Sequence, residues 1–157
     1  MKIAIKGGNK AQRKNVDSLV RFCAGRLMST RLANTIKLDV ILSRTFAKKH
    51  GDFGCCEWQD QNYRPKEFKI WVDSKQDPRA FYSTIAHEMV HVKQYARGEL
   101  KDFSRTIKLC KWKGETIECE KINYYDLPYE IEAHGRERGL FIRWFEQSQW
   151  KKCKWAQ

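Results

Sequence analysis

Hydrophobic side chains recur along this chain with two periods, one typical of helices and one typical of strands. In residues 9–28 they fall three to four positions apart, which predicts an amphipathic helix. In residues 35–42 they alternate with polar positions, at Ile36, Leu38, Val40 and Leu42, which predicts a half-buried strand. Residues 51–58 and 68–72 are expected to form two further strands.

The clearest predicted helix lies between Asp77 and Gly98. Asp77 can cap its first turn, where Pro78 is also well tolerated, and glycine is the residue that most often ends a helix. Between these signals the apolar residues form a single stripe, namely Phe81, Ile85, Met89, Val92 and Ala96.

A hairpin and a last helix are expected to follow. Residues 106–109 and 116–119 are predicted to pair as strands that turn near Gly114. Asp126 and Pro128 then open a helix that continues into residues 140–145. The order of helix, strands, helix, hairpin and helix predicts an α+β fold.

The length fits one domain spanning residues 1–157. We expect a helix at about residues 9–28, a core at residues 36–141 and a basic aromatic tail at residues 142–157. In that tail Trp144, Trp150 and Trp155 interleave with lysines, a composition that can grip single-stranded nucleic acid. The preferred interpretation is that the indoles pack and the lysines reach solvent.

The charge is strongly basic, with 31 Lys and Arg against 19 Asp and Glu and a net charge of +12. The basic residues are spread along the chain and form no long block. This pattern fits a solvated basic surface and a weak polyanion-binding or nucleic-acid-binding face equally well. No nucleic-acid-binding residue is assigned.

Six cysteines and the hydropathy bear on the compartment. No apolar run approaches the roughly 18 residues of a membrane span, and the apolar run at the N-terminus is too short for a secretion signal. A cytoplasmic protein without a membrane partner is therefore expected, with free thiols as the default. A disulfide between Cys110 and Cys119, across the predicted hairpin, is the less favoured alternative.

The candidate chemistry lies in the helix after Pro78, which contains His87-Glu88-Met89-Val90-His91. Residues four apart on a helix share a face, so His87 and His91 can bind one zinc ion. Glu88 projects beside them, where it can act as a general base toward a zinc-activated water. The apolar stripe lies on another face of this helix, so the helix can bury one side and present these groups on another.

A catalytic zinc usually takes three protein ligands, so a third is expected downstream. Lys101 stands where the third histidine of a metzincin would be. Glu130 lies in the first turn of the last helix, and Ala133, one turn on, allows close approach to the zinc helix. Facing favours Glu130 as the ligand, with Glu132 as the alternate.

Other side chains near this segment are candidates for supporting roles. His134 follows Glu130 by four residues and can support the ligands or donate a proton to the transition state. Tyr125 is a candidate to stabilise the transition state through its phenol. The alternative, non-catalytic interpretations are that the glutamates form a solvated acidic helix face and that the tyrosines are packed aromatic residues.

These motifs carry a resemblance to known proteins. Residues 85–95 resemble the active-site helix of SprT-like and related small metallopeptidases. The pairing of that motif with Glu130 and Ala133 resembles the gluzincins, including the ImmA/IrrE type. Residues 112–133 are similar to uncharacterised metallopeptidase-like proteins of bacteriophages, which implies the cytoplasm of a host cell. The resemblance covers roughly residues 36–141.

The resemblance implies a zincin-like fold, in which a small mixed sheet of three to four strands packs on the active-site helix. It also implies an edge strand, here residues 68–72, that binds an extended peptide. The predicted function is a zinc-dependent endopeptidase that holds one Zn²⁺ per chain and acts on a protein or peptide. The alternatives are a basic nucleic-acid- or assembly-binding protein that keeps the fold, and a metal-dependent hydrolase of a non-peptide amide or ester.

Overall fold

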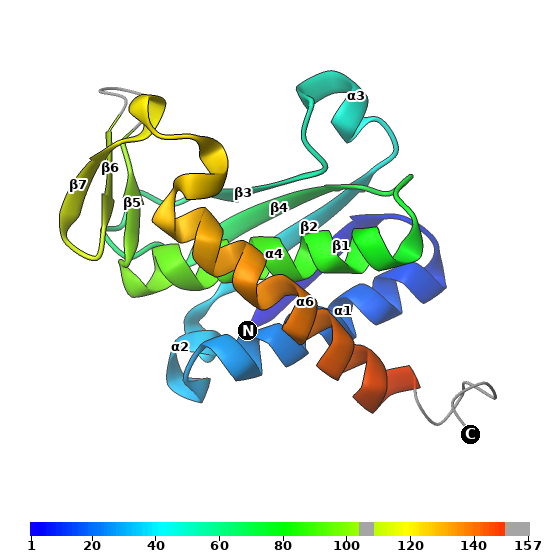
Figure 1. Cartoon of the computed structure of the whole chain (residues 1–157). Helices are drawn as coiled ribbons and strands as arrows, with labels where there is room; N and C mark the ends of the chain where they lie inside the picture. Colours follow the sequence, from blue (N-terminus) through cyan, green and yellow to red (C-terminus); the bar gives the residue numbers. More distant parts are fainter. Residues whose placement is uncertain (104–108, 150–157) are drawn as a thin grey trace.

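The main sheet of the protein has four strands and is mixed. The computed structural model describes residues 1–103 and 109–149 (Figure 1). The strands of this sheet are β1 (Lys2–Gly7), β2 (Lys37–Ser43), β3 (Gly54–Trp58) and β4 (Glu67–Asp73). Their order is β1-β2-β4-β3, with β1, β2 and β4 parallel and β3 antiparallel to β4. The mixed α+β class predicted from the hydrophobic pattern is confirmed.

The helices in the described residues are α1 (Lys10–Leu27), α2 (Thr30–Thr35), α3 (Phe46–His50), α4 (Pro78–Arg97) and α6 (Pro128–Gln149). Two long helices, α1 and α4, pack against the sheet, a third, α6, packs on α4, and two short helices lie in the connections. Helix α4 contacts β3 and β4 on one side, and both α1 and α6 pack against it. Figure 1 shows α6 crossing α4, and the first turns of α6 lie against the part of α4 that carries His87 and His91.

The ends of α4 match the local signals. Asp77 accepts hydrogen bonds from the backbone N–H groups of Arg79 and Ala80, and Pro78 occupies the first turn. Gly98 ends the helix with a φ of 71°, a left-handed conformation that glycine adopts without steric penalty. Ile85 and Met89 of the predicted stripe are fully buried, so this face anchors α4 in the core.

A second, smaller sheet lies beside the end of α4. Its strands are β5 (Leu100–Asp102), β6 (Leu109–Trp112) and β7 (Glu115–Glu118), and two 3₁₀ turns, η1 (Cys119–Lys121) and η2 (Tyr124–Asp126), lead from it to α6. Lys113 and Gly114 both have positive φ, as a two-residue hairpin turn requires. A disulfide joins Cys110 to Cys119, which corrects the free-thiol expectation for this pair. Cys23 and Cys56, also among the described residues, form no disulfide.

Several predicted boundaries differ from the structure. The strand at residues 68–72 is β4, which lies between β2 and β3, so the exposed edge near α4 is β3 and the predicted edge strand was wrong. Strand β1 was not predicted, because its apolar pattern is too short to indicate a strand by itself and the strand is held by parallel pairing with β2. The first predicted hairpin strand lies largely outside the described residues, and β6 begins at Leu109.

The C-terminal segment is more helical than predicted. Helix α6 continues through residue 149, and Trp144 is 2% exposed, with its indole N–H donating to Ser18. The first part of the predicted tail is therefore core structure. Trp150, Trp155 and the lysines between them lie outside the described residues. Within the described residues, no helix combines the length and hydrophobicity needed to cross a membrane.

Candidate metal centre

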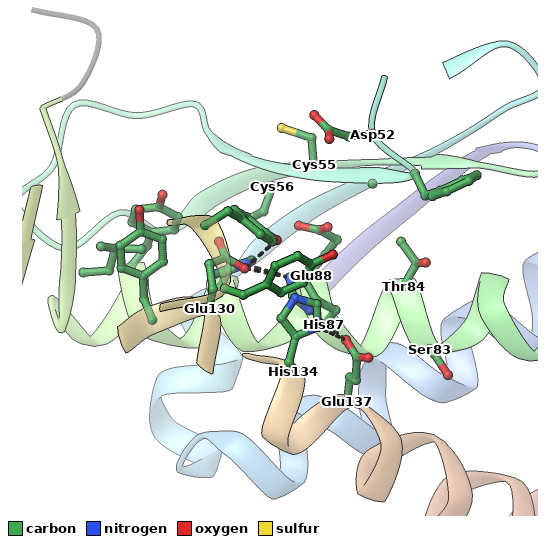
Figure 2. Close-up of a pocket in the computed structure, with 18 of the residues that line it drawn as sticks. Asp52, Cys55, Cys56, Ser83, Thr84, His87, Glu88, Glu130, His134 and Glu137 are labelled. Carbon is green, nitrogen blue, oxygen red and sulfur yellow. Dashed lines mark hydrogen bonds and ion pairs between the residues drawn. The ribbon is translucent and has the colours of Figure 1, made fainter. Parts of the chain in front are cut away.

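His87, His91 and Glu130 converge at the contact between α4 and α6 (Figure 2). The Nε2 atoms of the two histidines are 3.0 Å apart. Glu130 Oε2 lies 3.3 Å from His87 Nε2 and 3.5 Å from His91 Nε2. All three side chains are buried, with His91, the most exposed of them, at 8%. These three residues could bind a metal ion.

The three separations fit a zinc site. Ligand atoms that surround zinc tetrahedrally at about 2.0–2.2 Å stand roughly 3.3–3.6 Å from one another. The observed distances between the three donor atoms are 3.0, 3.3 and 3.5 Å. Two imidazoles and one carboxylate are also a donor set that zinc accepts, and one that leaves a coordination position open. The side chains therefore need little movement to hold such an ion.

Two hydrogen bonds orient the histidine rings. Glu137 Oε2 lies 2.8 Å from His87 Nδ1, and Gln94 Oε1 lies 2.8 Å from His91 Nδ1. Gln94 donates through its Nε2 to the Tyr129 carbonyl and to Glu132, so its oxygen is the atom left to accept from His91. Each Nδ1–H is thereby engaged, and a neutral ring presents its lone pair at Nε2, toward the shared centre.

The electrostatics of the cluster favour a cation. Burial lowers the pKa of His87, but hydrogen bonds to Glu130 and Glu137 outweigh this effect and raise it to about 10. Burial acts in the opposite direction on Glu130, yet hydrogen bonds to His87 and His91 hold its pKa far below the ordinary value. Glu130 is thus held as a carboxylate. Its negative charge stabilises a positive charge at the histidines, which is either a proton on an imidazole ring or a metal ion bound by the rings.

Tyr124 forms a further hydrogen bond with Glu130. Its hydroxyl donates to Glu130 Oε2 at 2.7 Å, from the turn η2 that precedes α6. Burial and this hydrogen bond raise the pKa of Tyr124 far above its ordinary value, so the phenol stays a donor. The hydrogen bond limits how the carboxylate can rotate relative to the two histidines.

Glu88 lies beside the cluster under the edge strand β3. Burial raises its pKa, although the nearby His91 and His87 oppose this shift. A raised carboxyl pKa suits a group that must accept and later release a proton. A Cβ at Gly54 of β3 would stand 2.7 Å from Glu88 Oε1 and 2.5 Å from Thr84 Cγ2. The glycine thus allows the edge strand to approach Glu88 closely.

The cluster lies in a cavity of about 770 Å³. Its walls come from β3, α4, β5, η2 and α6, and they include Glu88, Tyr124, Tyr125 and His134. Figure 2 shows Glu88, His87 and Glu130 near the centre, with Cys55 and Asp52 above them and His134 and Glu137 below. This space is large enough for several residues of a peptide and is open to solvent on one side.

The predicted supporting residues take different places. Glu132, the alternate third ligand, lies apart from the two histidines and accepts from Lys93 Nζ at 2.8 Å and from Gln94. His134 stacks near His87, with ring centroids 4.6 Å apart, and its Nδ1 is 3.3 Å from Glu137 Oε2. Tyr125 is 70% exposed at the rim, where its ring lies near those of Tyr124 and His134.

The roles of four residues of the site were not predicted from the sequence. Gln94 and Glu137 orient the histidines, Tyr124 holds Glu130, and Gly54 admits the edge strand. Gln94 and Glu137 did carry a weak signal, since each follows a candidate site residue, His91 and His134, by three positions on the same helix. Tyr124 contacts Glu130 through the irregular turn that leads into α6, and the position of Gly54 depends on a contact with Thr84 and Glu88, some thirty residues away.

Comparisons with known proteins returned no relative. No protein-family model matches the chain, and neither the curated proteins nor the solved structures contain a match.

Proposed function

We propose that this protein is a zinc-dependent endopeptidase with a zincin-like arrangement. One observation carries the proposal. Two histidine Nε2 atoms and a carboxylate oxygen converge within 3.5 Å of one another, and Glu88 stands beside them in an open cavity. A buried site that served structure alone would need no spare carboxylate with a raised pKa next to it.

His87, His91 and Glu130 would hold the ion. A zinc ion bound there supplies Lewis-acid catalysis, because it polarises a carbonyl and makes water more acidic. Magnesium and calcium prefer sets of oxygen ligands, so two imidazoles favour zinc or another transition metal. The resemblance of the motif to the gluzincins supports the same choice.

The remaining roles follow from position. Glu88 acts as the general base, taking a proton from water and passing it to the leaving amine. His134 and Tyr125, at the rim of the cavity, are suited to donate hydrogen bonds to the oxyanion that develops during hydrolysis. The backbone of β3, at the sheet edge above Glu88, is suited to pair with an extended peptide.

Metal content tests the site. Elemental analysis of purified wild type is expected to give about one zinc per chain, as a three-residue catalytic site predicts. Glu130→Ala should lose the metal, whereas Glu132→Ala, a matched carboxylate two positions away, should keep it. A wild-type protein that takes up no transition metal, even after refolding with zinc, would refute the proposal.

Activity tests the chemistry. Glu88→Gln is expected to retain zinc but to lose about 10²–10⁴-fold in peptide hydrolysis, the contribution typical of a general base. The assay uses a mixture of unstructured peptides, with cleavage products identified by mass spectrometry. If the zinc-loaded wild type cleaves amide or ester probes but no peptide, the protein is a metal-dependent hydrolase and the proposed peptide substrate is wrong.

A further inference from the structure

A second cavity of about 650 Å³ lies next to the candidate metal centre. Its walls come from the end of β3, the connection that follows β3, the helix α4 and the strand β5. Four aromatic residues, Trp58, Tyr63, Tyr95 and Phe103, line it with Leu100 and Pro65, and the polar lining consists of Gln61, Asn62, Lys101 and Asp102. This cavity contains none of the candidate metal ligands, so the proposed chemistry does not account for it.

The two cavities adjoin each other. Tyr95, Leu100 and Asp102 line both of them. Strand β3 and helix α4 run in the same direction past both. At one end Gly54 lies against Glu88, and at the other Trp58 packs on Tyr95, with ring centroids 4.9 Å apart. A peptide that follows β3 across the metal centre therefore runs into the aromatic cavity.

The walls favour a large apolar side chain. Leu100 is 2% exposed and closes the cavity on one side, while Tyr63 and Phe103 are 72% and 40% exposed at its opening. Lys101 places its ammonium 3.2 Å from the centroid of the Tyr63 ring, a cation–π contact that steadies this exposed ring. Aromatic walls bind aromatic and large aliphatic groups well, because stacked and edge-on contacts add to the burial of apolar surface.

Resting on the proposed peptidase function, we infer that this cavity binds an aromatic or large aliphatic side chain of the peptide substrate. The bound residue lies about two to four positions from the scissile bond. Tyr95 is one helical turn, roughly 6 Å, beyond His91, and Trp58 is four strand residues, roughly 13 Å, beyond Gly54. An extended peptide advances about 3.3 Å per residue, which converts these lengths into two to four residues.

A positional scan tests the inference. Internally quenched peptides share one scissile bond and carry a single Phe at successive positions on either side, against matched peptides with Ala. Wild type is expected to prefer Phe over Ala by about tenfold or more in kcat/KM at one position two to four residues from the bond. Tyr63→Ala and Phe103→Ala, which alter exposed rings and so spare the core, should reduce that preference.

Phe53→Ala is the matched control. Phe53 is 59% exposed and lines the other end of the first cavity, away from Trp58. Its removal should leave the ratio of Phe to Ala cleavage at the selected position unchanged. Cleavage without any positional preference would overturn the inference, and so would a preference that Tyr63→Ala and Phe103→Ala leave unchanged. Either result would leave the proposed peptidase activity supported.

Binding separates the two proposals if no peptide is cleaved. Fluorescence anisotropy of the labelled peptides is then measured on zinc-loaded Glu88→Gln protein. Tighter binding of a Phe peptide than of its Ala counterpart, lost on Tyr63→Ala, supports the cavity even where the peptidase fails. Equal binding overturns it. A dimer in sedimentation that Tyr63→Ala dissociates would instead assign the cavity to a second copy of the chain.

Discussion

Two charged clusters, each built on a buried side chain of α4, lie near the contact of α4 with α6, and they are neutralised in different ways. The first contains His87, His91 and Glu130. The second is centred on Lys93, which is 5% exposed and lies 2.6 Å from Glu99 Oε2 and 2.8 Å from Glu132 Oε1. The second cluster brings its own cation.

In the first cluster the positive charge comes from the histidines, since the pKa of His87 is raised to about 10, or from a cation that they bind. Within the described part of the chain, its hydrogen-bond and ion-pair contacts are to Glu137, Gln94 and Tyr124, with no lysine or arginine among them. Buried carboxylates need a positive charge or a proton nearby. Glu130 and Glu132 are two residues apart on one helix, but α4 places the two histidines beside Glu130 and the ammonium of Lys93 beside Glu132. Their surroundings therefore suit them for different roles.

Removing the cation of the second cluster should have the largest effect. Lys93→Met leaves Glu99 and Glu132 without their buried cation. We expect the free energy of unfolding to fall by about 3 kcal/mol, the lower end for a broken buried pair, because Arg97 and Arg136 still contact the two carboxylates. Chemical denaturation with a chelator present measures this apart from metal binding. Unchanged stability would show that the two carboxylates reach solvent or other partners, and would weaken the contrast between the clusters.

Zinc should stabilise the protein only through the first cluster. At free zinc 100-fold above the dissociation constant, the free energy of unfolding of wild type should rise by about 2.7 kcal/mol. His91→Ala should show no such rise, whereas Lys93→Met should still show it from its lower baseline. Denaturation curves recorded with zinc and with chelator measure this difference. If zinc also stabilised His91→Ala, the ion would bind at another site.

The residues that orient the histidines should matter next. Glu137→Ala removes the acceptor of His87 Nδ1–H and is expected to weaken zinc affinity about 10- to 100-fold, while Glu137→Gln keeps an acceptor and loses less. Competition with a chromophoric chelator measures the affinity. Glu146→Ala, an exposed acidic residue further along α6, is the matched control and should bind zinc as wild type does. Equal affinity in Glu137→Ala would remove the orienting role.

The smallest effect is expected at the rim of the second cluster. Arg136 lies 3.1 Å from Glu132 Oε1, but its side chain is 51% exposed, so water screens the pair. Arg136→Ala should lower the free energy of unfolding by no more than about 0.5 kcal/mol. A loss as large as that of Lys93→Met, in the same denaturation assay, would mean that Arg136 supplies the cation of the cluster.

The local features of the site could be predicted from the order of residues alone. Helix periodicity places His87 and His91 on one face, and the signals at Asp77 and Gly98 define the ends of that helix. Capping and periodicity act within about four residues along the chain, so they survive in any fold that keeps the helix. The facing argument based on Ala133, which is fully buried, also anticipated Glu130 in the cluster.

The long-range features depended on how distant segments meet. The edge position of β3 follows from strand order, and β1 pairs with a strand 35 residues further along the chain, which no local pattern indicates. Glu137 reaches His87 only where α4 meets α6, and contacts to Tyr129 and Glu132 of α6 orient Gln94 toward His91. Packing of segments far apart in sequence selects one arrangement among many that satisfy the same local rules. The candidate ligands could therefore be predicted from the chain, but the groups that orient them could not.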